Sequence, residues 1–134
     1  MNVIVCVDDN NGMLFNKRRQ SRDKAVIDKI INITKNNVLL ITDFSQNLFG
    51  NTAAKVKIYD NPLVEAETDD YCFIENLAIK DYANKINKLY VFKWNRKYPH
   101  DSLLDIDLSK YRLLSSEDFT GNSHGNITLE VYIR

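Results

Sequence analysis

The chain of 134 residues is 44% apolar and 27% charged, a balance typical of a folded globular protein and unlike that of a disordered or membrane-embedded chain. Lysine and arginine together number 18, as do aspartate and glutamate, so composition gives no net attraction to nucleic acid or to an anionic membrane. This length accommodates one compact core, and we expect a single domain over residues 1–134.

The N-terminal third predicts a strand, a turn and a helix. Residues 3–7 form an apolar run that closes on an Asn-Gly turn, as a buried strand does. Apolar side chains then recur at helical spacing over residues 22–34. Ser21 is in position to cap this helix, and Asp23 suits the positive end of the helix dipole.

The middle of the chain continues the alternation of strand and helix. Residues 38–41 predict a strand buried on both faces, and a short helix follows that Thr42 caps and that ends at Gly50. Residues 55–59 alternate as a third strand does, and an acidic connection follows.

Two further strands are predicted at residues 71–74 and 88–94, with a helix of about three turns between them over residues 77–86. Strands that alternate with helices pair in parallel through right-handed crossovers, so the pattern predicts an α/β domain. Residues 110–115 and 127–134 read as strands with no helix between them. We expect this last pair to close the sheet as an antiparallel hairpin at one edge.

The N-terminus lacks the pattern of a signal peptide, and no stretch approaches the length of a bilayer span, so we expect a cytoplasmic protein without a membrane partner. Cys6 and Cys72 lie in apolar runs and are interpreted as buried structural thiols. His100 and His124 have no partner at metal-ligand spacing, so no metal site is predicted.

A cluster of basic residues occupies the segment from Leu14 to Arg22 and the start of the helix. Such a cluster could bind a phosphate or RNA, but a solvated loop is favoured because no aromatic platform is interleaved with it, and we do not expect a nucleic-acid partner. Mutual repulsion predicts that the segment is mobile and poorly protected until an anionic ligand orders it. The basic residues are Lys17, Arg18, Arg19, Arg22 and Lys24.

Several stretches resemble the dihydrofolate reductase family, in the same order along the chain. Residues 1–13 resemble its opening strand and turn, residues 86–92 the strand after its third large helix, and residues 108–117 its penultimate strand. Asp101 stands where the family has an Asp-Thr pair, and residues 122–124 precede a closing strand as in the family. The resemblance implies a three-layer α/β fold, with a mainly parallel central sheet closed by an antiparallel C-terminal hairpin.

The positions that bind NADPH in that family are largely substituted here. Asp43 replaces an arginine that faces the cofactor's phosphate, which turns attraction into a repulsion of about 4 kcal/mol at contact distance near a surface. Glu75 and Asn76 replace a pair of glycines, so side chains fill the space in which a bare backbone approaches the nicotinamide. The positions that the resemblance assigns to the cofactor are Thr42, Ser45, Ile74, Glu75 and Asn76. We therefore expect no cofactor, or NADPH if the chain is an active reductase.

The positions that bind substrate in the family are less altered. Asp23 matches the carboxylate that assists protonation of the pterin, and Ile27 lies one helical turn later. Val5 and Cys6 match the first strand where it lines the pterin pocket, and Lys55 lies near the arginine that holds the glutamate tail of folate. The resemblance thus implies Asp23 as the catalytic residue and the other four as substrate-binding residues.

Two hypotheses about function remain. In the first, the chain is an active NADPH-dependent reductase of dihydrofolate or a related pterin, with Asp23 as proton relay. In the second, it is a degenerate relative that binds a pterin-like or folate-like ligand, another anionic small molecule or a protein partner. We favour the second, because the fold is kept while the site is what changed.

Overall fold

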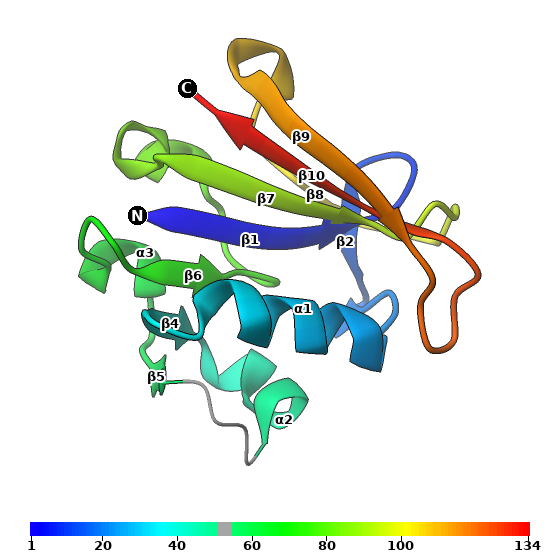
Figure 1. Ribbon diagram of the computed structural model, residues 1–134, viewed down its shortest axis with the longest axis horizontal. Coiled ribbons are helices and arrows are strands. Elements are labelled where there is room, and N and C mark those ends of the chain that lie inside the picture. Colours follow the sequence, from blue (N-terminus) through cyan, green and yellow to red (C-terminus); the bar gives the residue numbers. More distant parts are fainter. Residues whose placement is uncertain (51–54) are drawn as a thin grey trace.

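The computed structural model describes residues 1–50 and 55–134. Its centre is a sheet of seven strands (Figure 1). The strands are β1 (Asn2–Val7), β4 (Val38–Ile41), β5 (Lys55–Ile58), β6 (Tyr71–Phe73), β7 (Lys88–Lys93), β9 (Arg112–Phe119) and β10 (Ile127–Ile133). Their order across the sheet is β5-β4-β6-β1-β7-β10-β9.

The pairing of these strands confirms the predicted topology. β1 lies between β6 and β7 and is parallel to both, with Val3 opposite Cys72 on one side and Leu89 on the other. β10 runs antiparallel to β7 and to β9, so the last two strands form an antiparallel hairpin at one edge. β5 forms the opposite edge. The continuous apolar run of the first strand is explained by its central place, since both of its faces are covered.

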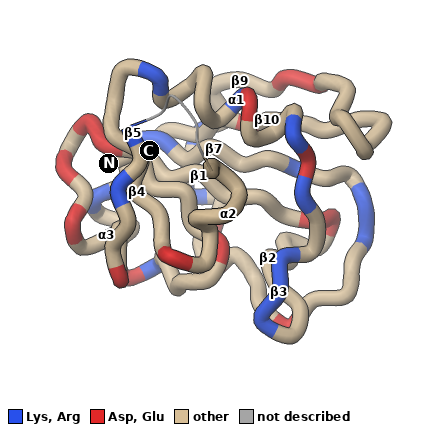
Figure 2. Tube along the Cα trace, turned by 90° about the horizontal axis from the view of Figure 1, so that it is seen from below, with Lys and Arg blue, Asp and Glu red and all other residues tan. Residues whose placement is uncertain are grey.

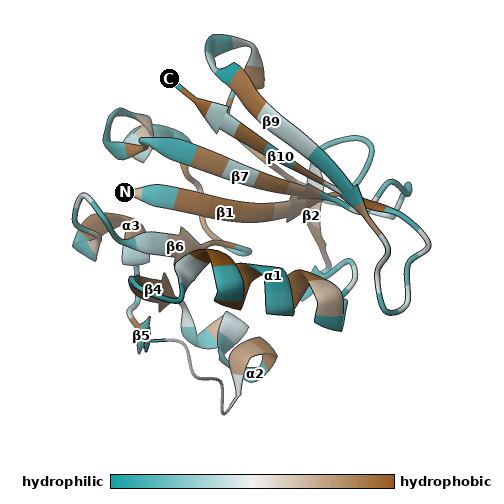
Figure 3. Ribbon diagram, viewed as in Figure 1, coloured by the Kyte–Doolittle hydropathy of each residue, from teal (hydrophilic) through white to brown (hydrophobic). Residues whose placement is uncertain are grey.

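Alternate side chains of β1 enter two separate cores, one on each face of the sheet. Ile4 packs with Val26 and Ile30 of helix α1 (Lys24–Thr34), whose apolar stripe faces the sheet in Figure 3. Val3 and Val5 enter the core on the other face. That face is covered by helix α3 (Pro62–Glu65), the 3-10 turns η2 (Lys80–Lys85) and η3 (Leu108–Lys110), and the chain between them. Three layers result, as expected.

Helix α1 begins two residues later than predicted. Asp23 is its N-cap, because the Asp23 carboxylate accepts the Ala25 amide hydrogen bond at 2.9 Å. The prediction that Ser21 caps the helix is wrong, since the Ser21 hydroxyl contacts His124 instead. The Ser21 hydroxyl therefore contacts a residue that is distant in the sequence, and not the backbone at the start of α1.

The segment from Thr42 to Gly50 forms a 3-10 turn, η1 (Asp43–Ser45), followed by helix α2 (Gln46–Phe49). It ends at Gly50 as predicted, and the positive φ of 43° there favours glycine. Thr42 stands at the N-terminus, but its hydroxyl does not cap the turn. Helix α3 lies in the acidic connection, where no helix was predicted.

The predicted helix of three turns over residues 77–86 is wrong, because this segment forms only the 3-10 turn η2. The backbone amides of Ile79 and Lys80 donate to the Asp105 carboxylate at 3.0 and 3.1 Å, so a distant side chain satisfies them. Ile79 and Ile86 are fully buried at the two ends of the segment. These tertiary anchors override the helical propensity of the segment.

The segment from Leu14 to Arg22 is not the loop that was predicted. Strands β2 (Gly12–Phe15) and β3 (Arg18–Arg19) form a hairpin, and β8 (Ser102–Leu103) completes a second sheet in the order β3-β2-β8. Asn16 and Lys17 have φ values of 50° and 61°, as a two-residue type I′ turn requires. The basic residues of the segment therefore stand on and after a hairpin, beside the labels β2 and β3 in Figure 2.

Within the described part of the chain, no helix is long and apolar enough to cross a membrane.

Candidate functional site

The candidate site lies where several parallel strands end at the same edge of the sheet. Cys6 is near the end of β1, and Glu75 and Trp94 follow β6 and β7. Ligands of parallel α/β sheets bind at this edge, because the loops after the strands diverge there. A small cavity of about 20 Å³ lies at this point, with room for one water molecule. It is lined by Cys6, Met13, Arg19, Gln20, Ser21, Arg22, Asp23, Val26, Ile27, Leu48, Phe73, Glu75 and Trp94.

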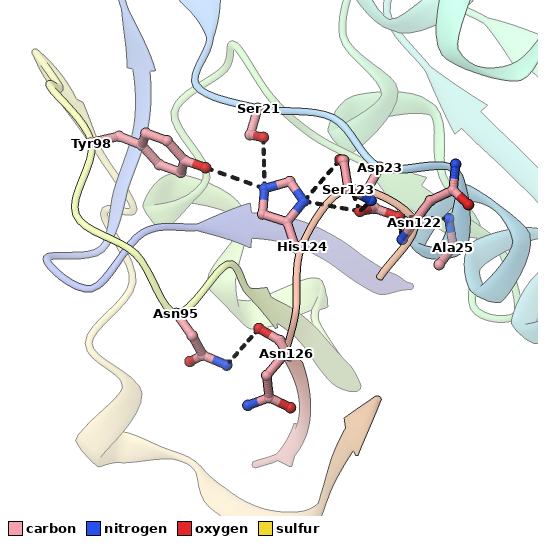
Figure 4. A network of polar contacts seen from close by, with 9 residues as sticks. All are labelled: Ser21, Asp23, Ala25, Asn95, Tyr98, Asn122, Ser123, His124 and Asn126. Carbon is pink, nitrogen blue, oxygen red and sulfur yellow. Dashed lines mark hydrogen bonds and ion pairs between the residues drawn. The ribbon is translucent and has the colours of Figure 1, made fainter. Parts of the chain in front are cut away.

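The Asp23 carboxylate is buried and saturated with hydrogen bonds. Besides the Ala25 amide, it accepts from the Asn122 amide at 2.7 Å and the Ser123 amide at 2.8 Å. The Ser123 hydroxyl lies at 3.2 Å and His124 Nδ1 at 2.9 Å (Figure 4). The carboxylate therefore ties the start of α1 to the loop that precedes β10.

This environment keeps Asp23 ionised. Burial by itself raises the pKa of the carboxyl, but the hydrogen bonds from Asn122, Ser123, His124 and Ala25 outweigh burial and hold the pKa well below its usual value. A proton donor near neutral pH needs the opposite, a raised pKa. The position that the resemblance makes a proton relay is thus occupied by a carboxylate bound to its neighbours.

His124 stands between Asp23 and two hydroxyl groups. Its Nδ1 atom faces Asp23, and its Nε2 atom lies 2.9 Å from Ser21 Oγ and 3.2 Å from the Tyr98 hydroxyl (Figure 4). The ring is 5% exposed and stacks on Trp94, with 4.8 Å between centroids and 27° between planes. The imidazole is therefore held on both nitrogens and on one face.

Arg19 and Glu75 form an ion pair in the cavity wall. Arg19 Nε and Nη2 lie 2.8 and 3.0 Å from the two carboxylate oxygens of Glu75, and the side chains are 18% and 9% exposed. Ser45 donates to the same carboxylate at 2.7 Å, and Arg19 also donates to the Phe44 carbonyl at 3.0 Å. This network joins the β2–β3 hairpin to the loops after β4 and β6.

The five positions assigned to the cofactor are brought together in part, but they bind one another. Thr42 donates to Asn76 Oδ1 at 3.1 Å, just as Ser45 donates to Glu75. Ile74 is fully buried in the core on the far face of the sheet. Of the five, only Glu75 lines the cavity. Asp43 is exposed beside them.

Of the positions assigned to substrate, some line the cavity and others lie far from it. Cys6 and Ile27 line the cavity together with Asp23. Val5 is fully buried in the core on the opposite face of the sheet, and Lys55 is exposed on the edge strand β5. Burial raises the pKa of the Cys6 thiol well above its usual value, so Cys6 is a packing residue of the wall and not a thiolate.

Two larger hollows open on either side of the cavity. One, of about 470 Å³, runs along α1 and shares Arg22, Asp23, Ile27 and Leu48 with the cavity wall. The other, of about 510 Å³, lies beside the β2–β3 hairpin and shares Arg19 and Gln20 with it. We call the first the α1 groove. It is completed by Lys24, Asp28, Ile31, Asn122 and Ser123.

No group of three or more histidine, cysteine, aspartate or glutamate side chains that could hold a metal ion occurs among residues 1–50 and 55–134.

Sequence reasoning missed the contacts of His124, Ser21 and Tyr98 and the pairing of Arg19 with Glu75. A histidine in a polar loop with glycines on both sides was a visible signal, since Gly121 and Gly125 flank His124. A Cβ added to Gly121 would lie 2.6 Å from Asp23 Oδ2, so only glycine permits this loop to approach the carboxylate.

No protein-family model matches the sequence, and no curated protein matches it significantly. Among solved structures, the chain is similar to the dihydrofolate reductase from Enterococcus faecalis complexed with NADP(H) and RAB-propyl. The TM-score is 0.68, over 99% of this chain and 95% of that chain, at 11% sequence identity. The chain therefore has a dihydrofolate reductase-like fold, and at this identity the similarity extends to the fold alone.

Proposed function

We propose that this protein is a degenerate dihydrofolate reductase-like binding protein, which does not use NADPH and holds a small anionic ligand, such as a folate-like molecule, in the α1 groove. The observation that carries the proposal is the network of Arg19, Glu75 and Ser45. Two of its residues, Ser45 and Glu75, stand at positions that the resemblance assigns to the cofactor, and Arg19 binds Glu75 there.

The polar groups of this network do not suit a dinucleotide. Arg19 and Ser45 direct their donors at Glu75, and a phosphate would have to compete with that carboxylate for them. Arg19 neutralises Glu75, so Glu75 itself adds little repulsion toward a phosphate. Asp43 remains as an exposed acid beside the same loop.

The small volume of the cavity also argues against a pterin ring beside a nicotinamide. Sites for small ligands have volumes of about 300–1,000 Å³. The cavity measures about 20 Å³, whereas the α1 groove measures about 470 Å³. We therefore place the ligand in the groove, and not in the cavity.

The α1 groove offers an apolar wall and an exposed arginine. Ile27, Ile31 and Leu48 supply the wall, and Arg22 supplies a positive charge near the N-terminus of α1. The Lys24 ammonium is paired with Asp28 at 3.0 Å, so Arg22 is the main candidate to bind an anion. A flat or aliphatic ligand with a carboxylate or phosphate group fits this combination.

Titration with NADPH, followed by cofactor fluorescence and by calorimetry, tests the loss of the cofactor. We expect a dissociation constant weaker than about 100 µM, and no oxidation of NADPH when dihydrofolate is added. A dissociation constant in the low micromolar range or tighter, or steady turnover of dihydrofolate, would instead support the alternative, an active reductase.

Titration with folic acid, followed by amide chemical shifts, tests the ligand. Shifts should be confined to the groove, and Arg22→Ala should weaken binding roughly tenfold, the effect of a lost charged contact. The matched control is Arg18→Ala, because Arg18 is an exposed arginine that lines the hollow beside the β2–β3 hairpin and not the α1 groove. Equal effects of the two substitutions would contradict the proposed location.

A further inference from the structure

Ser21, His124 and Asp23 have the geometry of a nucleophilic triad. Ser21 Oγ lies 2.9 Å from His124 Nε2, and His124 Nδ1 lies 2.9 Å from Asp23 Oδ2 (Figure 4). Such triads are recognised by this geometry and by the roles of the three groups, on unrelated folds and in any chain order. We propose that Ser21 is a nucleophile, activated by His124 and Asp23, that hydrolyses small carboxylic esters. This activity goes beyond the binding function proposed above and needs no nicotinamide cofactor.

The carboxylate determines which nitrogen of His124 carries the proton. The ionised Asp23 carboxylate accepts a hydrogen bond at Nδ1, so in the neutral imidazole the proton is on Nδ1 and the lone pair is on Nε2. Nε2 can then accept the proton of the Ser21 hydroxyl. The backbone amides of Asn122 and Ser123 hold Asp23 in place, and Trp94 fixes the plane of the ring.

Ser21 is the hydroxyl on the correct side of the ring, and it is accessible. It is half-buried in the extended segment between β3 and α1, and it lines the cavity. Ser123 also contacts His124, but at Nδ1, where the nitrogen carries the proton and cannot act as a base. Tyr98 lies at 3.2 Å from Nε2, farther than Ser21, and competes with it for the single lone pair.

The cavity supplies two further requirements of hydrolysis. Its volume admits one water molecule or one carbonyl group. The exposed Arg22 side chain lies in the wall and would face the negative charge that develops on the carbonyl oxygen. Gln20 Oε1 is buried without a hydrogen-bond partner in the part of the chain that the structure describes, so it is available to a water molecule in the cavity.

The reaction proceeds in two steps. In the first, Ser21 Oγ forms a bond to the ester carbonyl carbon while its proton passes to His124 Nε2; the bond to the alcohol oxygen breaks, and the alcohol leaves with that proton. In the second, water attacks the acyl-serine and gives its proton to His124, and the bond to Ser21 Oγ breaks as the serine regains a proton. The products are a carboxylic acid and an alcohol, and no oxidant or reductant is consumed.

The surroundings indicate the class of ester. Only the reacting carbonyl fits this small cavity, so the rest of the substrate must extend into the α1 groove, which shares Arg22 and Ile27 with the cavity wall. The apolar side chains of the groove suit a short aliphatic or aromatic acyl chain. A small activated ester such as p-nitrophenyl acetate is therefore a suitable probe.

Covalent labelling with a fluorophosphonate tests the proposal directly. The reagent forms an Oγ–P bond and releases fluoride, and intact mass with peptide mapping locates the adduct. We expect one adduct, on Ser21, in the full chain, and slow hydrolysis of p-nitrophenyl acetate. Ser21→Ala should abolish both. Ser116→Ala is the control, because Ser116 is an exposed serine of β9 that lines neither the cavity nor the α1 groove, and this variant should be labelled on Ser21 at the rate of the unsubstituted protein.

The role of His124 is tested with His124→Gln and Tyr98→Phe, each checked by thermal unfolding. His124→Gln should slow labelling of Ser21 roughly 100-fold or more, the contribution of a positioned general base. If His124→Gln does not fold, Tyr98→Phe still tests the triad. Removal of the competing phenol should leave the rate of Ser21 labelling unchanged or raise it. Any one of four results would overturn the triad. The first two are the absence of an adduct on Ser21 and an adduct on another residue alone. The other two are an undiminished labelling rate in folded His124→Gln and a tenfold lower labelling rate in Tyr98→Phe. The NADPH and folate titrations do not depend on these outcomes, so the two proposals can fail separately.

Discussion

The Asp23 carboxylate connects two parts of the chain, because the start of α1 and the loop at residues 122–124, including the His124 ring, donate to it. We expect Asp23→Asn to destabilise the protein by about 3 kcal/mol at pH 7, since the amide replaces an acceptor-only group among several donors. Urea unfolding of both proteins measures this difference. Asp28→Asn is the control, because Asp28 is an exposed acid on the same helix, and it should change stability by less than about 0.5 kcal/mol.

The same carboxylate predicts how stability depends on pH. Its pKa is lower in the folded than in the unfolded chain, so its contribution is fully present above the ordinary carboxyl pKa, near pH 4, and is lost as pH falls below that value towards the folded pKa. The stability difference between the unsubstituted protein and Asp23→Asn should therefore shrink between about pH 4 and pH 2. A difference that stays constant over this range would mean that Asp23 is not ionised in the folded protein.

At the scale of elements, the β2–β3 hairpin differs most from expectation. Its turn places Lys17 at φ 61°, a left-handed conformation that costs a residue with a Cβ about 1 kcal/mol relative to glycine. Lys17→Gly should therefore stabilise the protein by about 0.5 kcal/mol, after the extra entropy of glycine in the unfolded chain is subtracted. Thermal unfolding measures the gain. Lys24→Gly is the contrasting variant, because residue 24 lies in the first turn of α1. This substitution should not stabilise the protein.

The ion pair between Arg19 and Glu75 anchors the same hairpin to the central sheet. Glu75→Ala leaves the mostly buried guanidinium without its partner, which costs about 3 kcal/mol when a buried pair is broken. Native-state hydrogen exchange should then show faster exchange at Leu14 and Arg19, which pair across the hairpin. Fast exchange of these amides in the unsubstituted protein would mean that the hairpin is open in solution and that the pair does not hold it.

At the scale of the whole molecule, the C-terminal strand β10 is an internal strand, since β7 and β9 flank it. Its buried side chains Ile127, Leu129 and Val131 each contribute about 1.5–3 kcal/mol, so together they approach the total stability of a small domain, about 5–15 kcal/mol. Deletion of residues 127–134 should therefore abolish cooperative unfolding, measured by circular dichroism. Deletion of Arg134 alone, which removes two exposed hydrogen bonds to η2, should leave a cooperative transition.

The amino-acid sequence by itself determined the sheet. Buried runs such as residues 3–7 and 38–41, the alternation of residues 127–134 and the absence of a helix before them are local patterns. Together they predicted these strands, the mainly parallel pairing and the antiparallel C-terminal hairpin. Local patterns were insufficient where a distant group competed with the backbone. Asp105 is the example, because its carboxylate accepts the amides of Ile79 and Lys80 and a 3-10 turn replaces the predicted helix.

The candidate site was determined only by the tertiary structure. Ser21 and Asp23 are separated from His124 by 103 and 101 positions, and Arg19 from Glu75 by 56, so no periodicity in the sequence records that these groups meet. The family resemblance placed Glu75 in a cofactor site and made Asp23 a proton relay. The folded chain surrounds each with donors, and because hydrogen bonds and charges act over a few ångströms of space, the role of each carboxylate depends on which distant residues the folded sheet brings beside it.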